Sequence, residues 1–399
     1  LAIFLALLLP LFGFQAAGSL TEQFFPPADR DQFQVQLTLP QQASLQQTRA
    51  TVDEAHALLR AHPEVEAVHW FVGNSAPQFY YNMMVGEEGS PRFAQALVQL
   101  RDNQELSTRI RAIQAELDAV FPASLSLALQ LEQGPPFAAP IELRLFGPDL
   151  DVLAAAGEEA RAILAQVPGV THTRASLQEG LPKIWFRPQE EDLRLSGWNA
   201  RALAEDLQAS LDGVIGGTYM EETEELPIRV RRAAAERQAL ETLASLELRG
   251  EAGQSVPLHA LGEFELVPER ATITRRAGSR MNAVRGYLDA GLLPAESLAV
   301  FEQRLAEAGF QLPPGYSMSW GGEAAERDNA VGSLLANVAL LAILMVATLV
   351  LSFSSFRAAG VIGGVAMLAA GLGLASLWAS GYPFGFMAIL GLLGLIGLA

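Results

Sequence analysis

The chain has 399 residues, of which half are hydrophobic, 27 are basic and 44 are acidic; it has no cysteine and a formal net charge of −17. The first charged residue is Glu22, and residues 329–399 contain a single charged residue, Arg357. Such a stretch cannot form a water-facing surface, which excludes a wholly soluble globular protein. The acidic charge argues against nucleic-acid binding. The missing cysteine excludes disulfide scaffolds, thiolate metal sites and cysteine nucleophiles.

Residues 1–17 form an apolar run that we interpret as the end of a transmembrane helix. A signal peptide, with Ala16-Ala17-Gly18 as its small-residue cleavage flank, is the alternative. The chain opens without an initiator methionine, and its last residues, up to Ala399, lie inside another apolar run. We therefore expect a fragment of a longer membrane protein.

The first part of the charged region reads as an alternation of strands and helices. Its expected strands share apolar–polar alternation or a short apolar run, and its helices share apolar residues at helical spacing, the first from an N-cap at Ser44. The expected order is strand 33–39, helix 44–60, strands 65–72 and 78–85, helix 104–120 and strand 124–131. This β-α-β-β-α-β order is typical of a ferredoxin-like unit.

A second unit follows a Gly134-Pro135-Pro136 linker signal. It opens with strand 141–146 and helix 150–166, and then the pattern breaks. Strands 170–175 and 183–187 look paired with each other. The remaining expected elements are helix 198–210, a glycine- and glutamate-rich stretch at 213–227, strands 255–258, 263–267, 273–276 and 283–287, helix 295–308 and strand 316–320. A long excursion is thus inserted within the second unit.

Three further apolar segments, 332–352, 358–380 and a truncated 384–399, are predicted to enter the membrane. Arg357 is the one cation near their first connection, so the positive-inside rule places that turn in the cytoplasm. Residues 18–330 then lie outside. The predicted fold class is an α+β external region of ferredoxin-like βαβ subdomains with an inserted subdomain, plus α-helical transmembrane segments.

Several short motifs occur in a characteristic order. They are Phe24-Phe25-Pro26-Pro27-Ala28-Asp29-Arg30-Asp31-Gln32-Phe33, Pro77-Gln78-Phe79-Tyr80-Tyr81-Asn82, Pro168-Gly169-Val170, Arg275-Arg276-Ala277-Gly278-Ser279-Arg280, Leu312-Pro313-Pro314-Gly315-Tyr316 and Trp320-Gly321-Gly322-Glu323. Together with the topology they cover nearly the whole chain. The sequence resembles the C-terminal half of a resistance-nodulation-division (RND) efflux pump permease of the hydrophobe/amphiphile exporter, AcrB-like, branch.

The resemblance implies a division into subdomains. The segments are a transmembrane helix end (1–17), a first porter subdomain (18–136), a second porter subdomain in two parts (137–170 and 270–330), a docking subdomain (171–269) and transmembrane helices (331–399).

It also implies a multi-pass permease of the bacterial inner membrane with a large periplasmic loop, not an enzyme. The permease would be a homotrimer that exports drugs or other amphiphilic compounds from the periplasm or inner membrane. It would work with a periplasmic adaptor (membrane fusion protein) and an outer-membrane channel. Proton motive force would drive export without a cofactor, through relay residues outside this chain.

Two sets of residues are candidate sites within that scheme. Aromatic side chains offer stacking area to flat amphiphilic compounds, so the substrate candidates are His69, Trp70, Phe71, Phe79, Tyr81 and Met83. Strand alternation puts Trp70 with Val72 on one face, His69 with Phe71 on the other, and Phe79, Tyr81 and Met83 together. The alternative is that one of these faces is core. A soft-metal role for Met83 and Met84 has little support, and no metal site is predicted.

The docking candidates are Gly216, Gly217, Tyr219, Glu221 and Glu222. The plain alternative is a solvated acidic loop; the functional one is a hairpin that meets a neighbouring protomer or the outer-membrane channel. Two other functions stay open. One is a relative of the same superfamily that exports a lipid or another substrate, and the other is a membrane-anchored structural or binding module.

Overall fold

The computed structural model describes residues 2–84, 86–178, 180–233, 240–249, 255–267 and 272–398. The chain forms two compact units. One comprises Leu1–Gln178 with Thr272–Ala399, and the other is Glu179–Ala271.

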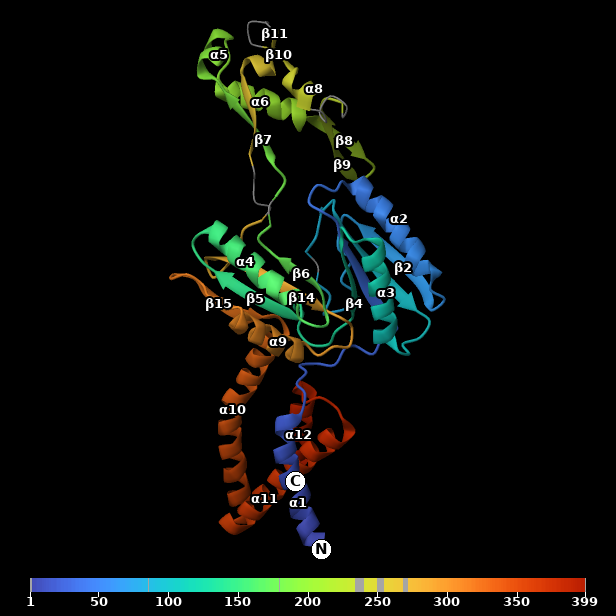
Figure 1. The fold of residues 1–399 in the computed structure, drawn as a ribbon, viewed down its shortest axis with the longest axis vertical. Helices are drawn as coiled ribbons and strands as arrows, with labels where there is room; N and C mark the ends of the chain where they lie inside the picture. The colour runs from blue at the N-terminus through green and yellow to red at the C-terminus, as the bar shows by residue number, and fades with distance from the viewer. Residues whose placement is uncertain are drawn as a thin grey trace. The chain divides into compact units, whose positions relative to one another are not determined.

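The first βαβ unit has the predicted order of elements. They are β1 (Gln32–Thr38), α2 (Leu45–Ala61), β2 (Val65–Val72), β3 (Phe93–Leu100), α3 (Leu106–Val120) and β4 (Leu125–Gln130). The antiparallel sheet has the order β2-β3-β1-β4, and both helices cover one of its faces (Figure 1). Between sheet and helices lies a core that includes Val35, Ala96, Leu59, Ile113 and Leu117.

The predicted start of α2 is confirmed. The Ser44 Oγ accepts a hydrogen bond from the Gln47 backbone N–H at 3.2 Å, and the Gln47 side chain accepts one from the Ser44 N–H at 2.8 Å. This reciprocal pair satisfies two of the N–H groups that a helix start leaves without a partner.

The predicted strand 78–85 is wrong, because β3 lies at Phe93–Leu100. Residues 73–92 are turns and loops wherever they are described. β3 is a central strand covered on both faces, so most of its residues are buried, including Gln95. A strand covered on both faces lacks the apolar–polar alternation by which a half-buried strand is recognised.

The second βαβ unit has the same topology as the first. Its strands are β5 (Ile141–Phe146), β6 (Val170–Ala175), β14 (Ser279–Leu288) and β15 (Ser317–Gly321), and its helices are α4 (Leu150–Leu164) and α9 (Pro294–Glu307). The order β6-β14-β5-β15 repeats β2-β3-β1-β4. The short β13 (Thr274–Arg276) forms a hairpin with β14.

The predicted pairing of 170–175 with 183–187 is also wrong. β6 pairs with β14, whereas β7 (Lys183–Pro188) pairs with β12 (Gly262–Val267) in the other compact unit. The Asn282 Oδ1 accepts a hydrogen bond from the Leu177 N–H at 3.0 Å and holds the end of β6 on β14. Pairing between neighbours in sequence is thus replaced by pairing with a strand about a hundred residues away.

Within Glu179–Ala271, a small core gathers Leu193, Leu203, Leu246, Leu248 and Leu258. The described elements are β7, α5 (Glu190–Leu195), α6 (Ala200–Leu211), β8 (Val214–Glu221), β9 (Glu224–Val230), α8 (Leu240–Ala244), β10 (Glu247–Arg249), β11 (Ser255–Pro257) and β12. β10 pairs with β11, and β8 with β9.

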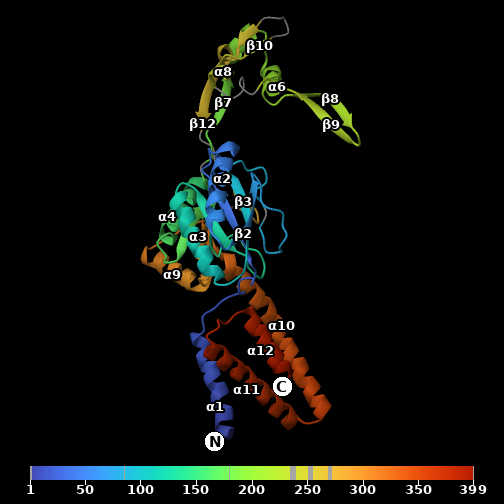
Figure 2. The ribbon, with the colours of Figure 1, turned by 90° about the vertical axis from the view of Figure 1, so that its right-hand side faces the viewer.

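Four apolar helices complete the larger unit: α1 (Ala2–Ala16), α10 (Gly322–Phe353), α11 (Phe356–Ser380) and α12 (Phe386–Leu398). α11 packs against α1, α10 and α12 (Figure 2). Among the described helices, α11 alone is long and apolar enough throughout to cross a membrane. Shorter apolar stretches lie at Leu7–Ser19, Leu340–Phe353 and Phe386–Leu398. Several membrane crossings therefore stay a prediction.

Candidate functional site

The segment His69-Trp70-Phe71 lines a hollow between β2 and α2. β2 is an edge strand of its sheet, and the hollow beside it has a volume of about 620 Å³. From α2 it is lined by Arg49, Val52, Asp53 and His56, and from β2 by Val68, His69, Trp70, Phe71 and Val72. The hollow therefore combines aromatic area with both signs of charge, which suits an amphiphilic ligand better than a purely apolar one.

The two faces of β2 serve different clusters. Val68, Trp70 and Val72 pack towards the core under α2, as their alternation predicts. The indole Nε1 of Trp70 is buried and has no hydrogen-bond partner. Phe71 points to the opposite face and packs against a cluster that includes Met83 and Leu131.

The loop at 73–92 places the other substrate candidates differently from the prediction. Because the segment is not a strand, Phe79, Tyr81 and Met83 do not share a face: Phe79 is 48% and Tyr81 57% exposed, whereas Met83 is 2% exposed. Met83 joins Phe71 in one cluster, while Phe79 and Tyr81 remain at the surface. Whether these residues bind a substrate stays a prediction.

Hydrogen bonds from buried and neighbouring polar groups fix this loop. The Gln95 Oε1 accepts a hydrogen bond from the Ala76 N–H at 2.7 Å, and the Gln95 Nε2 donates to the Gln34 Oε1 at 2.6 Å. Near the middle of the loop the Asn82 Nδ2 donates to the Gly134 carbonyl at 2.9 Å, and the Gly134 N–H donates to the Tyr81 hydroxyl at 3.0 Å. The exposed aromatic residues thus lie on a loop segment that is held on either side, at Ala76 and at Asn82.

The docking candidates form a β-hairpin, β8–β9. Glu221 pairs with Glu224, which leaves a two-residue turn in which Glu222 has a φ of 52°. A register shift between Ile215 and Gly217 marks a bulge at Gly216. Every residue of β8 is exposed, Tyr219 at 62%. Both strands of the hairpin thus lie almost wholly at the surface, and their role in docking stays a prediction.

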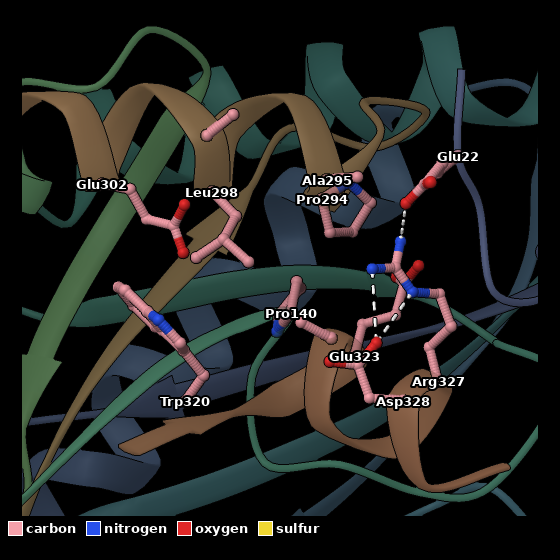
Figure 3. Close-up of a pocket in the computed structure, with 12 residues that line it drawn as sticks. Glu22, Pro140, Pro294, Ala295, Leu298, Glu302, Trp320, Glu323, Arg327 and Asp328 are labelled. Atoms are coloured by element: carbon pink, nitrogen blue, oxygen red, sulfur yellow. Dashed lines mark hydrogen bonds and ion pairs between the residues drawn. The ribbon is translucent and has the colours of Figure 1, made fainter. Parts of the chain in front are cut away.

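A third site lies where β15 continues into α10. The pocket has a volume of about 250 Å³ and is lined on one side by Trp320 and Glu302 and on the other by Glu22, Glu323 and Arg327 (Figure 3). In Figure 3 the Arg327 guanidinium lies between two carboxylates. It forms an ion pair with Glu22 and lies 3.4 Å from an oxygen of Asp328.

Glu323 connects this pocket to the segment that follows α1. Its Oε1 accepts a hydrogen bond from the Phe24 backbone N–H at 2.9 Å. Burial raises the pKa of Glu323, against the opposing effects of that hydrogen bond and of Arg327. Burial, and then the negative charge of Glu323, raise the pKa of Glu132 to about 7.

Sequence reasoning did not select Glu132 or Glu323 as functional residues. The available signal was the run Trp320-Gly321-Gly322-Glu323, which puts an acid in the first turn of a helix directly after two glycines. No such signal marks Glu132, whose neighbourhood is made by residues far away in the sequence. Among the described residues, no group of three or more His, Asp or Glu side chains is placed to hold a metal ion.

Several curated proteins similar to this chain are metal-resistance or cation-efflux proteins. The nickel and cobalt resistance protein CnrA of Cupriavidus metallidurans is 27% identical over 267 residues, which are 65% of this chain and 24% of CnrA. The nickel-cobalt-cadmium resistance protein NccA of Alcaligenes xylosoxydans xylosoxydans is 26% identical, over the same shares of the two chains. The matched part thus spans about a quarter of these relatives.

The fold is also similar to a solved structure, a heavy metal efflux pump. In its crystal form II the TM-score is 0.81 at 21% identity, covering 99% of this chain and 41% of that one. The AcrB/AcrD/AcrF family matches residues 1–399, the whole length of the sequence. By that match, and in agreement with its paired βαβ units, the chain belongs to the AcrB/AcrD/AcrF family of RND permeases.

Proposed function

We propose that this chain is part of a proton-driven RND efflux permease of the bacterial inner membrane. The family match over residues 1–399 carries the proposal. The two βαβ units act as porter subdomains, and α1 and α10–α12 belong to the membrane part. The permease acts as a homotrimer with a periplasmic adaptor and an outer-membrane channel.

Amphiphilic organic compounds are the first candidate substrate class. The hollow beside β2 supports it, because Trp70 supplies aromatic area while Arg49 and Asp53 line it with opposite charges. A volume of about 620 Å³ falls in the range of small-molecule pockets.

Divalent metal cations are the second candidate, favoured by the metal resistance for which the relatives CnrA and NccA are named. Such cations need several His, carboxylate or thiolate ligands around one point. Within the described residues these ligands are not gathered in groups of three or more. Metal export would therefore need ligands in addition to those that this part of the chain brings together.

The β8–β9 hairpin is proposed as the docking element. Its exposed apolar side chains include Ile215, Tyr219, Met220 and Ile228, and both of its faces are open to a partner. A neighbouring protomer or the outer-membrane channel would cover them.

The test uses the gene that encodes this chain in a host that lacks its own efflux permeases. Dye accumulation and tolerance to nickel, cobalt and zinc are measured for the wild type, Trp70→Ala and Trp185→Ala. Trp185 is the matched control, because it is half exposed on β7 in the other compact unit and is not among the residues that line the hollow. Dye export that is lost in Trp70→Ala alone supports the first substrate class, and metal tolerance without dye export supports the second. A host with unchanged dye and metal levels contradicts the transport proposal.

A further inference from the structure

Three segments far apart in sequence meet around Glu132 and Glu323. Glu132 follows β4 and forms a β-bridge with Pro27, in the segment after α1. The adjoining Leu131 carbonyl accepts a hydrogen bond from the Ala28 N–H at 2.8 Å. Glu323 lies in the first turn of α10 and holds the same segment through Phe24. Residues 24–28 are thus fastened to the end of β4 and to the start of α10.

The same segment is fastened to the apolar helices. The Phe384 N–H, in the connection between α11 and α12, donates to the Thr21 carbonyl at 2.7 Å, and the Phe386 N–H donates to the Phe24 carbonyl at 3.1 Å. The rings of Phe25 and Phe386 lie 5.3 Å apart. A displacement of the α11–α12 connection would therefore act directly on residues 21–25.

On the other side, the segment reaches the loop at 73–92. The Arg30 guanidinium stacks over the Tyr80 ring, 4.7 Å from its centroid. Burial raises the pKa of the Tyr80 hydroxyl, and the negative charge of Glu132 adds a smaller effect in the same direction. Two residues beyond Glu132, Gly134 exchanges hydrogen bonds with Asn82 and Tyr81.

We propose that Glu132 and Glu323 form a proton-responsive joint that links the apolar helices to the loop at 73–92. With Glu132 protonated, the two carboxyl groups coexist and the segment after α1 stays held by the end of β4 and by Glu323. With both groups ionised, like-charge repulsion in a half-buried site loosens the joint.

The charges around the pair leave this repulsion largely uncompensated. Arg327, one turn along α10, favours the ionised form of Glu323, but it is shared with Glu22 and Asp328. Arg30 lies over the Tyr80 ring. The Tyr80 hydroxyl loses its proton only at high pH, so it adds no charge near neutrality. A pKa of Glu132 of about 7 places the loss of its proton near neutrality. The joint is a property of the fold and does not depend on the proposed transport activity.

The experiment measures the distance between spin labels on the whole chain in lipid nanodiscs. Since the sequence has no cysteine, labels can be placed on Met84→Cys in the loop and Asn329→Cys on α10, both exposed positions. We expect the distance distribution to change between about pH 5.5 and about pH 8.5, with a midpoint near the Glu132 value of about 7. In Glu132→Gln the distribution stays at its low-pH form throughout.

Glu302→Gln is the matched control, since Glu302 lines the neighbouring pocket from α9 and is exposed. In this variant the distance distribution should change with pH as it does in the wild type. A distribution independent of pH in the wild type, or one that still titrates in Glu132→Gln, overturns the proposal. If circular dichroism shows that Glu132→Gln does not fold, Glu323→Gln replaces it, with the same expected loss of titration and the same contradicting result.

Discussion

Arg285 on β14 lies directly opposite Glu142 on β5, and its Nε is 2.9 Å from one carboxylate oxygen of Glu142. The other oxygen accepts a hydrogen bond from the Arg144 Nε at 2.5 Å. Glu142 itself is buried. Gly321 on β15 makes room for this triad, because a Cβ there would lie 2.6 Å from a Glu142 oxygen. The Glu142 carboxylate in the second sheet is thus paired with two guanidinium groups, and Gly321 leaves the space that it occupies.

Removing Glu142 should therefore be costly. Glu142→Ala leaves two guanidinium groups without their shared anion, and breaking a buried pair in this way typically costs roughly 3–5 kcal/mol. We expect a clear fall in the thermal midpoint, measured by tryptophan fluorescence. Glu158→Ala is the control, because the Glu158–Arg161 pair on α4 is exposed and such pairs contribute about 0–1 kcal/mol. Equal effects of the two substitutions would contradict the structural role of the triad.

The contributions of Glu132 and Glu142 to the free energy of unfolding should depend on pH in opposite directions. Burial acts to raise the pKa of Glu142, but hydrogen bonds and charges from Arg285 and Arg144 outweigh it, so the pKa is lowered. Its contribution is present above the unfolded-state value and is lost as the pH falls through the folded value.

For Glu132 the sign is reversed. Its pKa is raised from 4.5 to about 7, so its contribution is complete below about 4.5 and is lost as the pH rises to about 7. The shift corresponds to roughly 3 kcal/mol. Glu132→Gln should remove this loss, so the variant should melt above the wild type at about pH 8 and close to it at about pH 5. Thermal melts across that range measure the effect, and a wild-type stability that rises from pH 5 to pH 8 while the variant's stays level would contradict it.

Met83 and Met84 form a matched pair for testing the loop. Met83 is 2% exposed in its cluster with Ala28, Ala76 and Leu131, whereas Met84 is 47% exposed. Met83→Ala should cost roughly 2–5 kcal/mol through lost burial and a cavity, and Met84→Ala within about 0.5 kcal/mol. Thermal midpoints of the two variants give the comparison. If Met83→Ala leaves stability unchanged and impairs export, Met83 acts on the substrate and not on the packing.

The contact between α1 and α11 depends on two glycines. A Cβ on Gly13 would lie 1.8 Å from the Gly371 carbonyl oxygen, so Gly13→Ala must push the helices apart. Close backbone approach at small residues is a common way for apolar helices to associate in lipid. The rings of Phe12 and Trp378 are 5.2 Å apart in the same contact.

Cysteines at those two positions, Phe12→Cys and Trp378→Cys, allow the contact to be measured by a short cross-linker. We expect Gly13→Ala to reduce the cross-linking yield several-fold. Gly363→Ala should leave it unchanged, because nothing lies within 4 Å of a Cβ at that position of α11. The close packing of α1 on α11 would be refuted by a yield that is the same in both variants.

Local pattern sufficed for those parts of the fold that depend on neighbouring residues. Ser44 and Gln47 are three positions apart, and their capping box follows from their spacing. The β-α-β-β-α-β order and the apolar helix at Phe356–Ser380 likewise follow from periodicity and hydropathy. The resemblance to RND permeases rests on short motifs in order, and the family match bears it out.

The tertiary structure decided what depends on contacts between distant residues. β3 could not be located from its pattern because it is covered on both faces, and β6 joined β14 because Asn282 and the rest of that strand hold it there. Met83 is buried and Tyr81 exposed because the loop at 73–92 is shaped by Gln95 and Gly134. Glu132 and Glu323, 191 positions apart in the sequence, acquire their shared chemistry only when the chain brings them together. A carboxyl group's pKa is set by its desolvation and by neighbouring charges, and both are properties of the folded molecule.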